Sequence, residues 1–428
     1  MWNRAFVVAC LAHFVFTSQL FAETFVPALG ARSAGRAGTN LAFDDNAFVF
    51  SDNPAGLIGA TYRSNSCSTG VMDGTIVGLF PDVKYSDPQN ANVSASNSPF
   101  GLGAFTLAKR YNDDLAFGFG VYTPAGFGAR WNLEGPPGPL AGPQFYKSIG
   151  MLVRALPGVS YQATDRLRVG ATLGVAISHI ELEGPHFIST APLTGLPTII
   201  DLQATGAALS WSTGLQYEVT ELLTIGAHYQ SQNRFENNGS ASIAIPGVGR
   251  SHYDTTLDFV WPRVAGVGLK YELSPVTRFG VDVDWQQWSR AMNTVDIHLS
   301  NPDNPVFLAM AGPQVEDSMP LKWKDNVVVK CGVERDIAPN KTVRLGYGYN
   351  SDAVRASTMT PYLPTILSNY FTAGFGWRRC CWEYDTAYQY SYRPTLQTGQ
   401  SELVGGDHNN SSYDVQAHWL FLGATKKF

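Results

Sequence analysis

The sequence of 428 residues predicts an all-β fold, a transmembrane antiparallel β-barrel of about fourteen strands with an N-terminal hatch, or plug, inside the barrel. Three observations support this prediction. Segments along most of the chain alternate between apolar and small or polar residues. Short and long connections between these segments take turns, and both chain ends have features typical of bacterial outer-membrane proteins.

The N-terminus has the pattern of a secretory signal. Arg4 gives a positive start, Ala5–Phe16 is an apolar core, and 17–22 is a more polar tail, so we expect cleavage after Ala22. The alternative is a membrane anchor, but about a dozen apolar residues are too few to cross a bilayer core of ~30 Å as a helix. We therefore expect a signal peptide (1–22), an N-terminal hatch (23–58) and a transmembrane β-barrel (59–428).

The C-terminus ends on Phe428, directly after the strand-like run 413–424. A terminal aromatic residue that closes a strand is what bacterial barrels present to their assembly machinery, so we expect the barrel assembly machinery to be a partner. Together the two ends predict a barrel in the outer membrane of a Gram-negative bacterium, surrounded by outer-membrane lipid. We expect the barrel to be monomeric, although the sequence does not determine the oligomeric state.

Composition narrows the class of protein. Charged residues make up 15% of the chain, fewer than the roughly 25% of a soluble domain, and the mean hydropathy is −0.08. Glycine (42) and aromatic residues (12%) are plentiful, as in a barrel of many strands with aromatic girdles. The net charge of −5 and the absence of a basic run argue against a nucleic-acid partner.

The cysteines and histidines do not predict a metal site or a cofactor. Of five cysteines, Cys10 leaves with the signal, and Cys67, Cys331, Cys380 and Cys381 remain. Neighbouring residues on a strand point to opposite faces, so Cys380 and Cys381 cannot hold a metal jointly there. A disulfide is compatible with the periplasm, but the pairing stays open.

Alternation with a period of two defines the strands. In 166–179, residues 167, 169, 171, 173, 175 and 177 are apolar, and the intervening positions are Arg168, glycine, threonine, alanine and serine. The same parity recurs near residues 115–121, 209–217, 223–229, 265–271, 279–285, 343–349 and 371–377. A soluble β-sandwich can alternate too, but rarely in so many long segments behind a signal peptide.

The connections favour an up-and-down barrel. Short turns are expected at 111–113, 163–165, 219–221, 273–275 and 337–340. Long loops are expected at 87–99, 123–143, 184–203, 232–251, 300–320, 351–367 and 398–412. Short periplasmic turns and long extracellular loops must alternate in such a barrel, and counting between them gives about fourteen strands.

One segment before the first strand does not alternate. It contains a glycine-rich run, Gly30–Gly38, and then Asn53-Pro54-Ala55. A phosphate-binding loop is an alternative, but no strand precedes the glycines and no Gly-Lys-Ser/Thr follows. We therefore interpret the segment as a compact hatch, whose glycines permit tight turns against the barrel wall.

These motifs resemble the FadL/OmpP1/TodX family. The family's hatch has a G-R-A-G stretch and an Asn-Pro-Ala element, and the matching residues here are Gly35, Arg36, Gly38, Asn53, Pro54 and Ala55. Weaker likenesses are 283–290, 321–325 and 418–428. The resemblance implies outer-membrane transport of hydrophobic molecules, most simply long-chain fatty acids, by passive, hatch-gated diffusion. Uptake of neutral aromatic hydrocarbons, or a water-filled porin, stay as alternatives.

Two predicted loops are unusually apolar. The residues are Phe187, Ile188, Leu193, Leu196, Ile199 and Ile200 in one, and Val306, Phe307, Leu308 and Met310 in the other. Exposed apolar clusters usually mark a binding site. The resemblance assigns them to a low-affinity groove for the ligand, and mutual packing of the loops is the alternative.

The stretch after Tyr122 is a candidate for a gap in the wall. Proline removes a ladder hydrogen bond and glycine weakens a strand, so Pro124, Gly126 and Gly128 could bend this strand inward. In the family such a kink lets the ligand leave sideways into the membrane. The start of an ordinary loop is the alternative.

A cation inside the barrel would help to bind an acid. Parity places Arg168, Lys330 and Arg344 inward. However, this chain has Ser178-His179-Ile180 where the family's fatty-acid binders have basic residues, which leaves neutral hydrocarbons open.

Other function classes are less well supported. A hydrolase needs a nucleophile beside a base, and His179, His228 and His418 have no partner that spacing identifies, so we do not expect an enzyme. An adhesin would require activity in the loops alone.

Overall fold

The computed structural model describes residues 26–61, 69–96, 99–406 and 408–428. They form one closed antiparallel β-barrel of 14 strands, which confirms the predicted fold class. The barrel closes because β1 pairs with both β19 and β3. The predicted signal peptide and its cleavage site lie outside the described residues.

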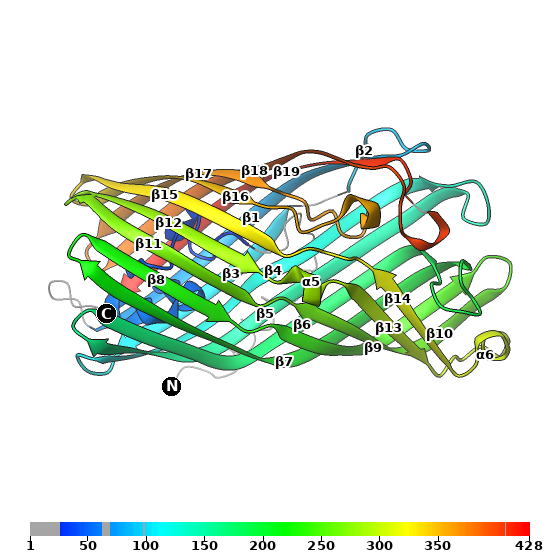
Figure 1. Ribbon diagram of the computed structural model, residues 1–428, viewed down its shortest axis with the longest axis horizontal. Helices are drawn as coiled ribbons and strands as arrows, with labels where there is room; N and C mark the ends of the chain where they lie inside the picture. Colours follow the sequence, from blue (N-terminus) through cyan, green and yellow to red (C-terminus); the bar gives the residue numbers. More distant parts are fainter. Residues whose placement is uncertain (1–25, 62–68, 97–98, 407) are drawn as a thin grey trace.

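The strands are long and tilted (Figure 1). Their bounds are β1 Gly70–Ser86, β2 Val93–Ser94, β3 Phe100–Arg110, β4 Leu115–Gly135, β5 Gly142–Thr164, β6 Leu167–Phe187, β7 Pro197–Thr220, β8 Leu223–Gln230, β9 Asn233–Ile245, β10 Gly249–Trp261, β11 Val264–Ser274, β12 Thr277–Gln286, β13 Thr294–Ser300, β14 Gln314–Pro320, β15 Asn326–Ala338, β16 Lys341–Asn350, β17 Asn369–Arg379, β18 Trp382–Thr398 and β19 Ser411–Lys427. β8 continues into β9, β10 into β11, β12 into β13 and β14 into β15, and each pair counts as one wall strand.

The predicted parity is present in the structure. On β6, Leu173, Val175 and Ile177 are exposed on the outside, while the alternating residues Ala176 and Ser178 are buried inside. An apolar outer face suits lipid, and the small inner residues leave room for other parts of the chain. None of the described helices is long and apolar enough to span a membrane.

The predicted short turns are confirmed within one or two residues, and they gather at one end of the barrel (Figure 1). Several predicted long loops are wrong, because the strands continue through them. β4 runs to Gly135. β6 and β7 remain paired as far as Phe187 and Pro197, and β9 and β10 remain paired as far as Ile245 and Gly249. Toward the end of the barrel with the long loops, the alternation of apolar and polar residues weakens. The strands continue there because pairing still satisfies the backbone N–H and C=O groups.

Residues 26–61, which we call the plug, lie inside the barrel toward the end with the short turns (Figure 1). Their elements are α2 Ala31–Ala34, α3 Val49–Asp52, the 3₁₀ helix η1 Pro54–Gly56 and α4 Leu57–Ala60. Further short helices are α5 Trp288–Ala291, α6 Pro305–Ala311, η2 Ala356–Thr358 and η3 Val404–Gly406. These last four lie between strands rather than in the plug.

Inward-facing wall glycines let the plug approach closely. A Cβ added to Gly170 of β6 would come within 2.5 Å of the Ala55 nitrogen, and one added to Gly346 of β16 within 2.5 Å of the Ala37 nitrogen. Any side chain at these positions would collide with the plug backbone. The high glycine content therefore reflects plug–wall packing as well as turns.

The cysteines differ from the expectation. Cys380 and Cys381 lie in the turn between β17 and β18, not in a strand, and Cys380 has a positive φ of 55°. Cys381 is disulfide-bonded, while Cys331 and Cys380 are free thiols.

Candidate functional site

Buried ion pairs tie the plug to the barrel wall. Arg36 is completely buried, and its guanidinium lies 2.8 Å from Asp45 of the plug and 3.2 Å from Glu334 of β15. Arg32 pairs with Glu383 of β18. Burial alone would raise the pKa of the Asp45 carboxyl, but the neighbouring Arg36 and Arg32 hold that pKa well below its usual range. The network therefore stays charged and fixes the plug electrostatically.

The three predicted lumen cations all face the interior, and each is paired with carboxylates. The pairs are Arg168 with Asp44 (2.5 Å) and Glu218 (2.7 Å), Lys330 with Asp284 (2.9 Å), and Arg344 with Glu334 (2.5 Å) and Asp385 (2.7 Å). Protein carboxylates already neutralise these charges. None of the three offers an unpaired charge to a ligand.

The predicted hatch motifs lie against the wall. The side-chain nitrogen of Asn53 donates to the Leu215 carbonyl of β7 (2.9 Å), and Ser160 of β5 donates to the Ala55 carbonyl (2.8 Å). Pro54 begins η1, where its missing N–H is not needed. Gly38 has a φ of +79°, which glycine adopts without strain.

β4 leaves the regular wall at the predicted kink. Residues 122–129 are all buried, although exposed and buried residues alternate on either side. The pairing with β5 shifts register between Tyr122 and Ala125, a β-bulge that contains Pro124. The pairing with β3 ends at Ala104 and Tyr122. In the described chain, β3 and β4 are not paired beyond that point.

The first described residue of the plug reaches this kink. The Val26 N–H donates to the Pro124 carbonyl at 2.9 Å. Val26 and Ala28 also pack in the same apolar cluster as Phe127 of the kinked stretch. The first described plug residues thus lie at the place where the wall ladder is interrupted.

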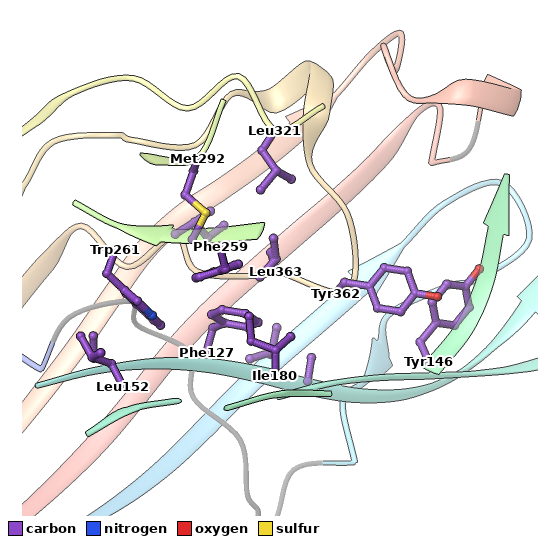
Figure 2. Close-up of a cluster of buried hydrophobic side chains, with 14 of the residues drawn as sticks. Phe127, Tyr146, Leu152, Ile180, Phe259, Trp261, Met292, Leu321, Tyr362 and Leu363 are labelled. Carbon is purple, nitrogen blue, oxygen red and sulfur yellow. The ribbon is translucent and has the colours of Figure 1, made fainter. Parts of the chain in front are cut away.

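Above the plug, the interior is filled with aromatic and aliphatic side chains. Phe127 lies among Phe259, Trp261, Ile180 and Leu363 (Figure 2), with ring centroids 5.8 Å from Phe259 and 6.2 Å from Trp261. These side chains come from four separate segments of the chain: β4, β6, β10 and the connection between β16 and β17. An interior of this kind suits an apolar ligand rather than an open column of water.

Arg154 of β5 is a buried cation of a different kind. It is 1% exposed and lies between the inward-facing Leu152 and Leu156. Its guanidinium donates to Asn233 Oδ1 at 2.8 Å, and its cross-strand neighbour is Tyr122, where the kink begins. Its Nε has no hydrogen-bond partner, and no carboxylate among the described residues stabilises its charge. A buried guanidinium without a counter-charge is costly, which suggests a place for an anion.

The first apolar cluster does not form one loop. Phe187 ends β6, and Ile199 and Ile200 belong to β7, so only 188–196 connects the strands. Ile188 and Ile200 are buried. Phe187 lines a hollow of about 370 Å³ at the long-loop end, together with parts of the loops after β1, β4 and β18.

The second cluster forms α6 between β13 and β14. Phe307 is 3% exposed, whereas Leu308 and Met310 are 45% and 39% exposed. Asn304 caps the helix and donates to the Arg250 carbonyl beside the β9–β10 turn (2.9 Å). The cluster therefore lies at the tip of the barrel and is separate from the lining of the hollow.

Comparison with known proteins decides the family. The family described as "Outer membrane protein transport protein (OMPP1/FadL/TodX)" matches residues 13–428. The chain belongs to this family. It is an outer-membrane transporter of hydrophobic compounds, which confirms the predicted location and the prediction of a transporter rather than an enzyme. Among curated proteins, no sequence matches.

Solved structures of this family have the same fold. The toluene transporter TodX of Pseudomonas putida is 17% identical with a TM-score of 0.76, over 94% of this chain and 99% of that one. The toluene transporter TbuX of Ralstonia pickettii is 19% identical with a TM-score of 0.73, over the same shares. A FadL homologue of Pseudomonas aeruginosa is 16% identical with a TM-score of 0.73, over 95% and 100%.

Sequence reasoning missed two functional candidates in this family member. The first is Arg154, although alternation with Leu152 and Leu156 places it on the inner face. The second is His408, which lines the hollow. Only the folded chain shows that no carboxylate reaches Arg154, and that His408 meets side chains from β1 and β5.

Proposed function

We propose that the chain lets hydrophobic molecules diffuse passively from the outside into the barrel and then sideways into the membrane at the β4 kink. The observation that carries this proposal is the interrupted ladder beyond Tyr122, next to an apolar interior. A ligand at Phe127 would be adjacent to a stretch of wall that lacks β3–β4 pairs. No group in the described chain suggests an energy source.

The gate of this path is the start of the plug. Val26 holds the kink through one backbone hydrogen bond to Pro124, whereas the plug from Arg32 onward is tied down by buried ion pairs. The least-fixed part of a structure opens first. Movement of residues 26–30 alone would free the kink, and the rest of the plug would stay in place.

The ligand proposed first is a long-chain fatty acid. Arg154 supports it, because a carboxylate would supply the counter-charge that this buried guanidinium lacks. Its position beside Tyr122 would place the acid group below the kink and leave the hydrocarbon tail among the apolar residues near Phe127.

The second candidate is a neutral aromatic hydrocarbon. The pairing of Arg168, Lys330 and Arg344 with carboxylates favours it, since the other predicted cations are not available to an acid. Two proteins of similar fold are described as toluene transporters.

Uptake of labelled oleate and labelled toluene tests the proposal, in cells with and without the chain, beside conductance in planar bilayers. We expect chain-dependent uptake and no large steady conductance. A large conductance without uptake would indicate a water-filled porin and contradict the proposal.

Arg154→Met separates the two ligands. It keeps most of the side-chain volume and removes the charge. We expect oleate uptake to fall by about tenfold or more, the effect of one lost charge-assisted hydrogen bond, while toluene uptake stays unchanged. Lys322→Met is the matched control, since Lys322 is exposed and pairs with Glu402 in the loops. Equal effects on both ligands would show that Arg154 serves only the fold.

A further inference from the structure

The hollow at the long-loop end has the size of a small-molecule site. Its volume of about 370 Å³ lies within the range of roughly 300–1,000 Å³ that is typical of ligand pockets. Its walls include Tyr85, Leu133, Tyr146, Phe187 and His408, together with several prolines of the β4–β5 loop. These side chains give flat, mostly apolar surfaces.

His408 connects this hollow with two tyrosines. The imidazole ring lies edge-on to Tyr85 and Tyr146, with centroid distances of 6.1 and 6.2 Å. Its Nδ1 is 3.0 Å from the Tyr85 hydroxyl. Tyr85 and Tyr146 in turn contact Trp131 and Tyr362, so the hollow lies directly above the aromatic interior.

The hydrogen bonds fix which nitrogen of His408 carries the proton. The Tyr85 hydroxyl is 2.9 Å from Asp87 Oδ2. The other oxygen of Asp87, Oδ1, accepts from the backbone N–H groups of Gln89 and Asn90, and a carboxylate only accepts hydrogen bonds. Tyr85 must donate its single proton to Asp87. It can then only accept from His408, so the proton is on Nδ1 and a lone pair is on Nε2.

The Nε2 acceptor has no partner among the residues that the structure describes. No described residue lies within hydrogen-bond distance of it, and burial lowers the pKa of His408 to about 4, so the ring is neutral near pH 7. A ligand O–H or N–H could therefore donate to Nε2, whereas a group that only accepts hydrogen bonds could not.

The charges around the hollow exclude an acid. Among its described lining residues there is no lysine or arginine, while Asp87 and Glu134 are both present. A carboxylate ligand would meet two negative groups and find no cation. A neutral molecule with one hydrogen-bond donor fits the lining better.

We propose that this hollow is an outer capture site for small neutral phenols, with the aromatic ring between Tyr85, Tyr146 and the prolines and the hydroxyl donating to His408 Nε2. The proposal deepens the proposed function, because it names a class of ligand that the barrel would take up first. Neither Arg154 nor the β4 kink takes part in this binding.

The test is equilibrium binding of p-cresol, toluene and 4-methylbenzoate to the purified full chain in lipid nanodiscs at pH 7, measured by saturation-transfer NMR against empty nanodiscs. These probes share the ring and methyl group and differ in the donor and the charge. We expect p-cresol to bind about tenfold more tightly than toluene, the effect of one hydrogen bond, and 4-methylbenzoate to bind most weakly. Equal binding of p-cresol and toluene, or tightest binding of 4-methylbenzoate, would overturn the proposal.

His408→Phe keeps a ring and removes the acceptor. It should lower p-cresol binding to the level of toluene and leave toluene binding unchanged, whereas His252→Phe, at an exposed histidine paired with Asp303, should change neither. Gln89→Trp, at an exposed position on the hollow, should weaken both neutral ligands by filling the space. Persistence of p-cresol selectivity in His408→Phe, or of binding in Gln89→Trp, would contradict the site. Because binding is measured without uptake, failure here is distinct from failure of lateral transport.

Discussion

Val26 and Arg36 belong to the same plug, yet the contacts that hold them differ in strength. Breaking a buried ion pair such as that of Arg36 with Glu334 costs about 3–5 kcal/mol. The backbone hydrogen bond from Val26 to Pro124 has a net value of about 1 kcal/mol. At the residue scale, movement is therefore expected to begin at Val26.

Val26→Pro tests this difference, because proline has no N–H to donate to Pro124. The closed state should lose about 1 kcal/mol, which corresponds to roughly fivefold more frequent opening and faster uptake of oleate or toluene. Initial uptake rates in cells with equal surface amounts of protein measure the effect. Val26→Ala, which keeps the N–H, is the control. Slower or unchanged uptake in Val26→Pro would place the gate elsewhere.

At the scale of elements, β4 shows how far sequence alone can go. The sequence predicts that Pro124, Gly126 and Gly128 weaken the strand, and a loop from 123 onward is the alternative. In the structure, the strand continues to Gly135. Its middle residues, 122–129, are buried inside the barrel. The loss of alternation in the sequence signals a change at this point. It does not distinguish a loop from a strand that is buried on both faces.

The same element gives a prediction about Gly150 of β5. A Cβ added there would overlap the Phe127 ring, so Gly150→Val should push Phe127 out of its position at the kink. Overpacking of this kind costs about 1–3 kcal/mol and should narrow the path, so we expect uptake to fall by about tenfold. Gly74→Val on β1, where an added Cβ meets nothing within 4 Å, should leave uptake unchanged. Equal uptake by both variants would show that Phe127 does not lie on the path of the ligand.

At the scale of the whole molecule, sequence predicts the features that depend on a local pattern of residues. Strand parity and the short turns follow from each segment's need to face lipid on one side. The pairing of Arg168 with Asp44 joins residues 124 positions apart, and the parity of β6 shows only that Arg168 points inward. For the same reason, the sequence does not show that Arg154 lacks a carboxylate partner among the described residues. Side-chain pairing across the barrel depends on the register of all the strands, which no single segment encodes.

Hydrogen exchange of the whole chain in lipid nanodiscs tests how the plug behaves while ligand passes. If the ion pairs of Arg32 and Arg36 hold the plug to the wall, backbone amides of 32–58 should exchange slowly with and without oleate. Amides of 26–30 should exchange faster, and oleate should change the exchange of this short stretch and of the β4 kink alone. Arg378→Met, which removes a half-exposed cation that pairs with Asp336, is a control that should leave both regions unchanged. Fast exchange of 32–58 upon addition of oleate would mean that the plug moves as one unit, and the path would then run through the barrel rather than through its wall.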